Sequence, residues 1–377
     1  MTEKIARFFA ETQPATPCLV VDLDVVGDNY DRLHGALPDA RIFYAVKANP
    51  AHEILTLLAA RGSCFDTASV PEIEMCLAAG ATPDRISFGN TIKKASDIAR
   101  AHALGVALYA FDSIEELEKI AVHAPGARVF CRILTSGEGA DWPLSRKFGC
   151  EPEMARDLLL RAAGMGVVPY GVSFHVGSQQ RDVGQWDLAL ATTAAIFRDL
   201  EEKGVALRMV NLGGGFPTRY LKDVPTSQEY GAAIAASLRR HFGNRLPETI
   251  IEPGRGMVGN AGVIQSEVVL ISRKSDREED RRWVYLDIGK FGGLAETMDE
   301  AIKYPILTPR DGGATEPVII AGPTCDSADV LYEKTDYRLP VDLKIGDRVS
   351  ILATGAYTTT YSAVNFNGFS PLKAYYI

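Results

Sequence analysis

The sequence predicts an α/β protein made of a (β/α)8 TIM barrel and a second, mainly antiparallel β domain. Two observations support this. Between residues 41 and 255, short runs of β-branched and aromatic residues alternate with longer helical patterns rich in alanine, leucine and glutamate, which is typical of parallel strands joined by helices. After residue 256 the pattern changes to β-rich runs separated by glycine and proline, which is typical of antiparallel strands.

The barrel strands can be placed in order along the chain. Helical stretches such as "AHEILTLLAARG" and "VPEIEMCLAAG" lie between the expected strands, with glycine at the expected helix ends. Eight strand-helix units are the number that closes a TIM barrel. The eight expected strands are "RIFYAVKA" (41–48), "SCFDTAS" (63–69), "RISFGN" (85–90), "VALYAFD" (106–112), "ARVFCRIL" (127–134), "YGVSFHVGS" (170–178), "RMVNLGGG" (208–215) and "ETIIEPGR" (248–255).

The β domain is expected to be discontinuous in sequence. The run "CLVVDLD" (18–24) precedes the first barrel strand and could pair with later β runs. We therefore expect the barrel to span residues 25–256 and the β domain to comprise residues 1–24 and 257–377. The later β runs are "VGNAGVIQSEVVLISRK", "RRWVYLDIG", "PVIIAGP" and "DRVSILATGAY".

Composition and charge favour small-molecule chemistry. The chain has 377 residues, 46% of them hydrophobic and 23% charged, so it can bury a large core in more than one domain. Its formal net charge of −8 and pI near 5.4 oppose a basic surface for nucleic acid or for an anionic membrane. We expect no nucleic-acid or membrane partner.

The N-terminal segment, the lengths of the apolar runs and the cysteines lead to two further expectations. The start, "MTEKIARFFAETQP", carries acidic residues within a short apolar stretch, unlike a secretory signal, and no apolar run approaches membrane-spanning length. We therefore expect a cytoplasmic protein. The six cysteines form no C-x-x-C pair and have no histidine spacing suited to zinc, so we expect no metal site.

Polar residues end most of the expected barrel strands. In TIM barrels the carboxyl ends of the strands lie on one rim and carry the active site, so we expect several of these side chains to converge on one pocket. They are Lys47, Asp66, Asn90, Asp112, Arg132, His175, the glycines 213–215, and Glu252 with Arg255.

Two neighbouring motifs suggest an anion site. In "NLGGGFP", three consecutive glycines expose backbone N–H groups that suit a phosphate, although a tight strand-to-helix turn explains them equally well. In "IEPGRG", which ends the next strand, Arg255 suits an anion and Glu252 could point at a ligand or form an ordinary surface ion pair. Phosphate sites in TIM barrels often use the loops after the seventh and eighth strands.

Other candidate residues also have two readings. Lys47 in "FYAVKANP" is either a snorkelling side chain or a reactive amine, and His175 in "SFHVGSQ" is either structural or catalytic. In "GPTCDSAD", Cys325 and Asp326 could donate a proton or hold a cationic substrate, or could be a buried small residue and a turn-capping aspartate.

Seven motifs together resemble a known family, the fold-type III pyridoxal-phosphate decarboxylases. This alanine-racemase-like family includes ornithine, lysine, arginine and diaminopimelate decarboxylases, and the resemblance covers nearly the whole chain. The last two motifs are most similar to ornithine decarboxylases, and the short chain resembles a bacterial member. In family order the motifs are "FYAVKANP", "FDTAS", "FHVGSQ", "GGGFP", "EPGRG", "GPTCDS" and "GAYTTTYSAVNFNGF".

The resemblance implies roles for individual residues. Lys47 matches the lysine that binds pyridoxal 5'-phosphate covalently, His175 the histidine stacked on its ring, and Glu252 the carboxylate facing the pyridine nitrogen. Cys325 matches the residue that protonates the substrate's α-carbon, and Asp326 a carboxylate that grips the distal ammonium. Both would come from the partner subunit of a homodimer with shared sites. The matches to cofactor-lining and phosphate-binding positions are Asp66, Ser178, Gly213, Gly214, Gly215, Gly254, Arg255 and Tyr357.

Two segments depart from the eukaryotic enzymes of this family. Pro143 stands where those enzymes have an arginine, so that contact is lost or replaced. The segment "GGLAETMDEAIKYPI" (292–306) corresponds to their specificity region but differs in detail. Counting back from Pro305 places Asp299 at the position of the family's substrate-binding aspartate. Glu296, one helical turn away, is the alternative residue for this role.

The resemblance implies α-decarboxylation of a basic L-amino acid. L-Ornithine, giving putrescine for polyamine biosynthesis, is the first choice, and L-lysine, giving cadaverine, differs by one methylene worth about 1–3 kcal/mol in a pocket. Alternatives on the same fold are a diaminopimelate or arginine decarboxylase, or a racemase. An alternative from another class is a catalytically dead regulatory homologue, which would need neither Lys47 nor Cys325.

Overall fold

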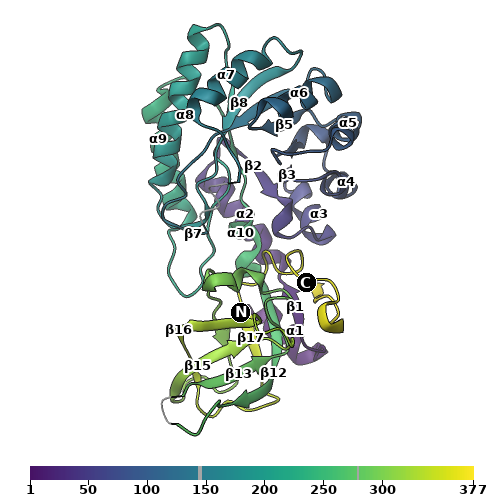
Figure 1. Cartoon of the computed structure of the whole chain (residues 1–377), viewed down its shortest axis with the longest axis vertical. Helices are drawn as coiled ribbons and strands as arrows, with labels where there is room; N and C mark the ends of the chain where they lie inside the picture. Colours follow the sequence, from purple (N-terminus) through teal and green to yellow (C-terminus); the bar gives the residue numbers. More distant parts are fainter. Residues whose placement is uncertain (143–146, 278–279) are drawn as a thin grey trace. The chain divides into compact units, whose positions relative to one another are not determined.

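The computed structural model describes residues 1–142, 147–277 and 280–377, which divide into two compact units. The barrel unit comprises Gly27–Pro217 and Val224–Met257. The β unit comprises Met1–Val26, Thr218–Asp223 and Val258–Ile377. Figure 1 shows the secondary structure of both units.

The barrel unit contains a closed, eight-stranded parallel barrel. Each strand pairs in parallel with its neighbours, and the ring closes because β11 pairs with β2. The predicted fold class is confirmed. In spatial order from the first barrel strand, the strands are β2 (Ala40–Ala45), β3 (Cys64–Thr67), β4 (Ile86–Phe88), β5 (Leu108–Phe111), β6 (Arg128–Arg132), β8 (Val168–Ser173), β10 (Met209–Asn211) and β11 (Glu248–Ile251).

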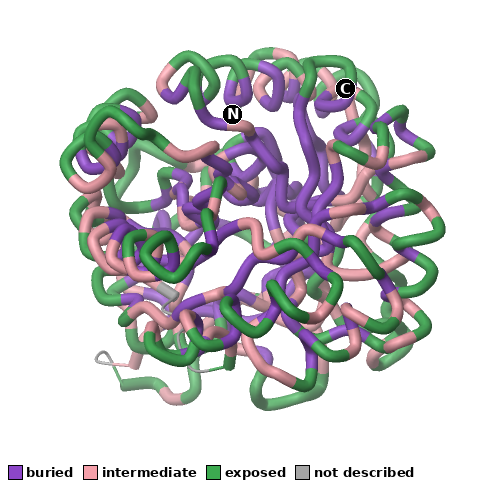
Figure 2. Tube along the Cα trace, turned by 90° about the horizontal axis from the view of Figure 1, so that it is seen from above, coloured by how far each residue is buried: buried purple, intermediate pink, exposed green. Residues whose placement is uncertain are grey.

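Apolar side chains from alternate positions of these strands fill the barrel interior. Burying them removes apolar surface from water, the main favourable contribution to folding. Figure 2 shows buried residues inside and exposed residues along the outer helices. One interior cluster consists of Phe43, Cys64, Leu108, Ala110, Phe130, Met209 and Ile250.

Three of the described helices that follow barrel strands start at side-chain caps. Ser69 and Ser113 each accept a backbone N–H three residues on, and Thr226 and Glu229 form a capping box. The helices are α2 (Leu23–Ala36), α3 (His52–Ala60), α4 (Val70–Ala78), α5 (Ala95–Ala103), α6 (Ile114–His123), α7 (Pro152–Ala162), α8 (Gln185–Glu202), α9 (Ser227–Phe242) and α10 (Arg255–Val258), with 3-10 turns η1 (Val46–Ala48) and η2 (Pro83–Arg85). A short antiparallel pair joins β7 (Ala140–Trp142) to β9 (Ser178–Gln180).

The β unit is a mixed sheet with the order β14-β17-β12-β13-β15-β16, and β1 pairs with β12 and β18. Most pairs are antiparallel, but β13–β15 and β1–β18 are parallel. Its elements are α1 (Glu3–Thr12), β1 (Cys18–Val21), η3 (Gly259–Ala261), β12 (Gly262–Ser272), β13 (Arg282–Leu286), η4 (Ala295–Glu300), β14 (Ile306–Leu307), β15 (Thr315–Ala321), β16 (Val330–Pro340), β17 (Arg348–Leu352), η5 (Phe366–Gly368) and β18 (Lys373–Tyr376).

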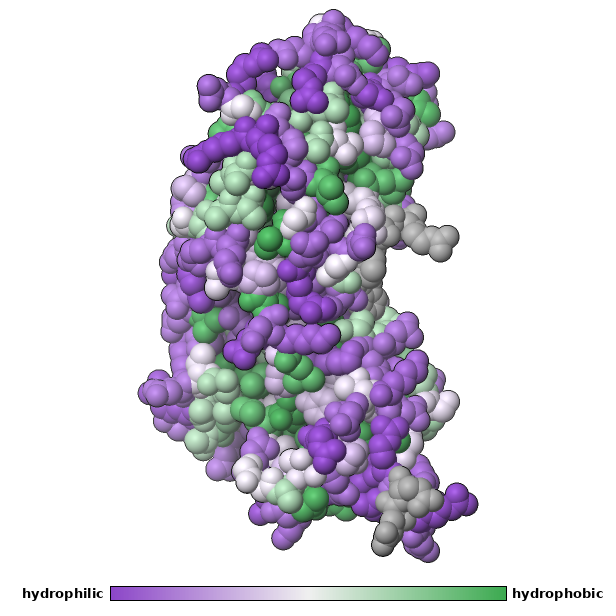
Figure 3. All heavy atoms as spheres, turned by 90° about the vertical axis from the view of Figure 1, so that its left-hand side faces the viewer, coloured by the Kyte–Doolittle hydropathy of each residue, from purple (hydrophilic) through white to green (hydrophobic). Residues whose placement is uncertain are grey.

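One face of the molecule is drawn by residue hydropathy in Figure 3. On the face drawn in Figure 3, hydrophilic residues predominate and hydrophobic ones occur in small groups. Among the described residues, no helix has the length and apolar character needed to cross a membrane.

Candidate active site

Lys47, Asp66 and Glu252 share one electrostatic environment at the carboxyl ends of β2, β3 and β11. Lys47 lies in η1, directly after β2, and its side chain is exposed between buried neighbours. Burial and the nearby Glu252 raise the pKa of Asp66 well above its ordinary value, and the charge of Lys47 acts in the opposite direction. The expected convergence of these strand ends is therefore present within the barrel.

The strand next to Asp66 makes room for its carboxyl group. Ser87 Oγ donates a hydrogen bond to Asp66 Oδ1 at 3.2 Å. A Cβ on Gly89, just beyond β4, would overlap the same oxygen atom. Only glycine at this position leaves Asp66 its place at the rim.

His175 follows β8 and is held by its backbone and its ring. Its carbonyl accepts a hydrogen bond from the Thr135 hydroxyl at 2.5 Å, and its Nδ1 accepts the N–H of Gly214 at 3.2 Å. Burial, together with the positive charges of Arg132 and Lys47, lowers the pKa of His175 well below its ordinary value. The imidazole is therefore neutral.

The glycine run approaches its neighbours too closely for side chains. Gly213 and Gly215 have φ angles of 66° and 98°, a region that disfavours residues with a Cβ. A Cβ on Gly214 would lie 2.6 Å from the carbonyl oxygen of Glu252. The run is thus packed against the end of β11 and against the loop of His175.

Asn211, at the end of β10, joins this glycine run to Glu252. Its Nδ2 donates a hydrogen bond to Glu252 Oε1, and its Oδ1 accepts the N–H of Gly213 at 2.9 Å. The N–H of Glu252 in turn donates to the carbonyl of Gly213 at 2.8 Å. Sequence reasoning missed Asn211, although its place directly before the glycines was the available signal.

A guanidinium and a hydroxyl that contact each other lie beside the glycines. Arg255 is buried at the start of α10, and its Nη2 and Nε donate hydrogen bonds to Ser178 Oγ at 3.1 and 3.4 Å. Gly254 precedes it in a turn whose carbonyl accepts the N–H of Met257. A guanidinium and a hydroxyl next to glycine backbone form a donor set suited to a phosphate.

Arg132 is a further site residue that the sequence placed at a strand end without a role. Its positive charge helps to lower the pKa of His175. Burial lowers the pKa of Arg132 itself, and the nearby Glu252 and Asp66 oppose that shift. The Arg132 guanidinium also lies 5.4 Å from the ring centroid of Phe148. Pro143, where the sequence departs from the eukaryotic pattern, lies outside the described residues.

A second lysine lies at the barrel rim, but its amine is occupied. Lys93 is buried, donates hydrogen bonds to the carbonyls of Asn90 and Ala110 at 2.7 Å each, and pairs with Glu116 at 2.9 Å. Burial lowers its pKa to about 8. Three fixed contacts make Lys93 a structural tie between the loop after β4 and α6.

Five predicted site residues belong to the β unit. Cys325 is exposed, and its N–H donates to Asn367 Oδ1 at 3.1 Å. Asp326 accepts the N–H of Ala328 at 2.8 Å, a turn-capping contact. In η4, Glu296 is only 6% exposed, whereas Asp299 is exposed with φ 51°. Tyr357 also has a positive φ, 55°.

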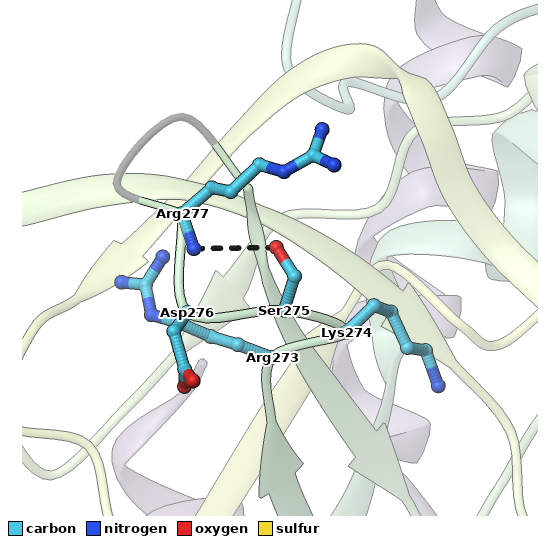
Figure 4. A pocket seen from close by; sticks show the side chains of 5 residues that line it. All are labelled: Arg273, Lys274, Ser275, Asp276 and Arg277. Carbon is cyan, nitrogen blue, oxygen red and sulfur yellow. Dashed lines mark hydrogen bonds between the residues drawn. The ribbon is translucent and has the colours of Figure 1, made fainter.

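A separate hollow in the β unit contains none of the predicted site residues. It lies at the turn between β12 and β13, where basic side chains surround Ser275 (Figure 4). Arg273 is paired there with Glu316 at 2.8 Å, and Lys274 contacts the ring of Trp283. The residues that line it are Arg273, Lys274, Ser275, Asp276 and Arg277.

The chemistry of the barrel rim fits pyridoxal phosphate. Arg255, Ser178 and the glycines suit its phosphate, a carboxylate held by an amide donor suits its pyridine nitrogen, and a neutral imidazole suits its ring face. An exposed lysine next to two carboxyl groups suits its aldehyde. A (β/α)8 barrel with this rim defines the class of barrel-fold pyridoxal-phosphate enzymes.

Within that class, the chain belongs to the pyridoxal-dependent decarboxylases. Residues 23–259 match the model of that family's pyridoxal binding domain. The predicted family and the predicted cofactor, pyridoxal 5'-phosphate, are confirmed by this match.

Individual relatives cover almost the entire chain. It is 36% identical over 371 residues to the lysine/ornithine decarboxylase of Selenomonas ruminantium, which covers 98% of this chain and 91% of that protein. The lysine/ornithine decarboxylase of Vibrio vulnificus, complexed with cadaverine, has a TM-score of 0.88 and 31% identity over 100% of this chain and 99% of that one. The arginine decarboxylase of Paramecium bursaria Chlorella virus has a TM-score of 0.90 and 27% identity over 100% of both chains.

Proposed function

We propose that the protein removes the α-carboxyl group of L-ornithine, forming putrescine, and also accepts L-lysine, forming cadaverine. The observation that carries this proposal is the barrel rim, where Lys47 lies with Asp66 and Glu252 beside the Arg255–Ser178 pair. The lysine/ornithine decarboxylases among its relatives support the choice of substrate. We propose further that the enzyme contributes these diamines to polyamine biosynthesis and acts in the cytoplasm.

The barrel residues hold the cofactor. Lys47 would bind it covalently until a substrate amine takes its place, with Asp66 lining the site beside it. Arg255, Ser178, Gly254 and the three glycines would hold its phosphate. The role of Tyr357 in phosphate binding stays a prediction from the resemblance. When bound, pyridoxal phosphate accepts the electron pair that carbon dioxide leaves behind.

Glu252 and His175 adjust the electronics of the site. The amide of Asn211 donates to the Glu252 carboxylate and holds it in place. Glu252 would interact with the pyridine nitrogen of the cofactor and hold a proton there, which would increase the ring's capacity to accept electrons. The neutral imidazole of His175 can lie against the ring without adding a competing positive charge.

Cys325 returns a proton to the α-carbon after carbon dioxide leaves. Its thiol is exposed, while its N–H is held by Asn367. We place Cys325 and Asp326 at the active site of the partner subunit, in a homodimer with two shared sites, as the resemblance implies. An exposed thiol on a hydrogen-bonded loop suits that role.

Carboxylates bind the distal ammonium group of the substrate. Asp326 supplies one, and either Asp299, which is exposed, or Glu296, which is buried, supplies the other. Diaminopimelate would need a cation for its distal carboxylate, which these residues do not provide. Because one relative is a viral arginine decarboxylase, L-arginine remains the alternative substrate.

A substrate panel tests the proposal. Release of carbon dioxide is measured from L-ornithine, L-lysine, L-arginine and meso-diaminopimelate, with the amine products identified by mass. We expect ornithine and lysine to be the two best substrates. Diaminopimelate or arginine as the best substrate would overturn the assignment, and no turnover of any of them would favour a regulatory homologue.

A further inference from the structure

A buried carboxylate lies at the base of the loop that carries Cys325. Asp329 is 2% exposed and directly precedes β16. Its Oδ1 accepts the N–H of Lys290 at 2.8 Å, and its Oδ2 accepts both the N–H and the hydroxyl of Thr324, at 3.1 and 2.7 Å. A buried charge is tolerated only where hydrogen-bond donors satisfy it, so these three bonds define the position of the carboxylate.

The surrounding backbone is shaped around Asp329. A Cβ on Gly289 or on Gly322 would overlap its carboxyl group, so two separate segments use glycine where they meet it. The loop also closes on itself, because the N–H of Gly322 donates to the carbonyl of Asp329 at 2.8 Å and the N–H of Asp329 donates to the carbonyl of Asp326 at 3.0 Å. Cys325 therefore lies on a closed loop with a fixed base.

Thr324 transmits this constraint to Cys325. Both its N–H and its hydroxyl bind the Asp329 carboxylate, which fixes the residue immediately before the thiol. The N–H of Cys325 itself is held from the other side by Asn367 Oδ1 at 3.1 Å. Cys325 itself is exposed.

We propose that Asp329 is a positioning residue for decarboxylation, because its carboxylate sets the place of the Cys325 thiol through Thr324. The inference rests on the proposed function of Cys325 as the proton donor to the α-carbon. Proton transfer requires the donor within hydrogen-bond reach, and a displacement of 1 Å can lower a rate by about a hundredfold. Loss of the Asp329 contacts should thus affect kcat more than KM.

The first test is Asp329→Asn in the holoenzyme. The substitution keeps the size of the side chain but turns one acceptor oxygen into an N–H donor that faces another donor. We expect kcat for ornithine or lysine to fall by about ten- to a hundredfold with KM changed by less than about threefold. An unchanged kcat would overturn the proposal.

A double-mutant cycle separates positioning from general damage. In a Cys325→Ala background there is no thiol to position, so Asp329→Asn should lower kcat by no more than about twofold further. If Asp329→Asn costs the same factor with and without the thiol, Asp329 does not act through Cys325 and the proposal is wrong.

Thiol alkylation gives a readout that does not depend on turnover. Cys325 is the one exposed cysteine of the six, all of which lie in described parts of the chain. Iodoacetamide should therefore label it selectively, and Cys325→Ala should remove the label. We expect Asp329→Asn to raise the labelling rate by at least about threefold; an unchanged rate would contradict a role in fixing the loop.

Two further variants control for folding. Asp22→Asn alters a carboxylate of the same unit that is 3% exposed and accepts one N–H, from Asp24 at 3.1 Å, and one threonine hydroxyl, from Thr2 at 2.7 Å; it also pairs with Lys4 at 3.5 Å. It should lower the melting temperature without changing the labelling rate. Thr324→Val should reproduce part of the Asp329→Asn effect and Thr324→Ser should not; equal behaviour of the two would count against the proposal.

The proposed function and the proposed role of Asp329 can fail separately. If the wild type decarboxylates none of the panel, the proposed function is wrong, while the labelling experiment still decides whether Asp329 fixes the loop.

Discussion

The N–H of Gly214 donates a hydrogen bond to Nδ1 of His175 at 3.2 Å. An Nδ1 that accepts a hydrogen bond carries no proton, so the ring proton is on Nε2 and the imidazole is neutral. The same glycine run is tied through Asn211 to Glu252. One backbone segment therefore sets the protonation state of the residue proposed to face the ring and the position of the residue proposed to face its nitrogen.

His175 should remain neutral across the working pH range. Its folded pKa lies well below its ordinary value of 6.5, so the unfolded chain binds the proton first and stability is lost as pH falls below about 6.5. Nitrogen-15 spectra should show the Nε2-protonated neutral form from about pH 5.5 to about pH 8. A titration of this ring near pH 6.5 would contradict the geometry described.

Asp66→Asn should stabilise the apoprotein at high pH. Because burial and Glu252 raise the folded pKa of Asp66 above its ordinary value, the stability of the wild type is highest at low pH and decreases as pH rises toward that folded pKa. In urea unfolding between about pH 5 and pH 8, the free energy of unfolding of the variant should exceed that of the wild type by at least about 1 kcal/mol. Asp39→Asn, at an exposed position of the same unit, should show no such gain.

Cys325→Ala should damage product formation far more than cofactor binding. Removing a proton donor costs about a hundred- to ten-thousandfold in rate. The rate of amine formation and the cofactor absorbance of the same preparation are the two measurements. Unchanged turnover would remove Cys325 from the mechanism.

Glu300→Gln should destabilise the β unit most at neutral pH. The Glu300 carboxylate accepts the N–H groups of Glu333, Lys334 and Thr335, at 2.7, 2.5 and 2.8 Å, and the hydroxyl of Thr335. Burial raises the pKa of Glu300, but these bonds outweigh it and lower the pKa to about 2. The contribution of Glu300 to the free energy of unfolding is therefore present above about pH 4.5 and is lost as pH falls toward 2.

The expected loss for this variant at pH 7 is about 1.5–3 kcal/mol in urea unfolding, as for bonds to a charged group. Glu333→Gln, an exposed acid of the neighbouring strand, should cost much less. Equal losses for both variants, or a Glu300→Gln loss that persists at low pH, would contradict the assignment.

The barrel was predictable from sequence because its signal is local. Each short apolar run lies near its observed strand, and the polar residues after β2, β3, β10 and β11 fall on one rim as parallel topology requires. The sixth run was drawn too long: β8 ends at Ser173, and His175 lies in the loop that follows. That loop is fixed by Thr135 and Gly214, which are distant in sequence.

The missed features depend on contacts that a single sequence does not reveal. Asn211 and Glu252 are separated by 41 positions and only the closed barrel brings them together. The parallel pairing of β13 with β15 in a mainly antiparallel sheet likewise depends on the long connection between them. Asp299, placed by counting along the chain, stays a prediction beside Glu296; counting does not register that Asp299 has a positive φ and an exposed side chain.

The most direct test of the account is to identify the lysine that carries the cofactor. The holoenzyme is reduced with borohydride, digested and mapped by mass spectrometry, with Lys47→Ala as the control. We predict a cofactor adduct on Lys47, absent from the variant. An adduct on another lysine, such as the buried Lys93 whose pKa is lowered to about 8, or no adduct at all, would contradict the account.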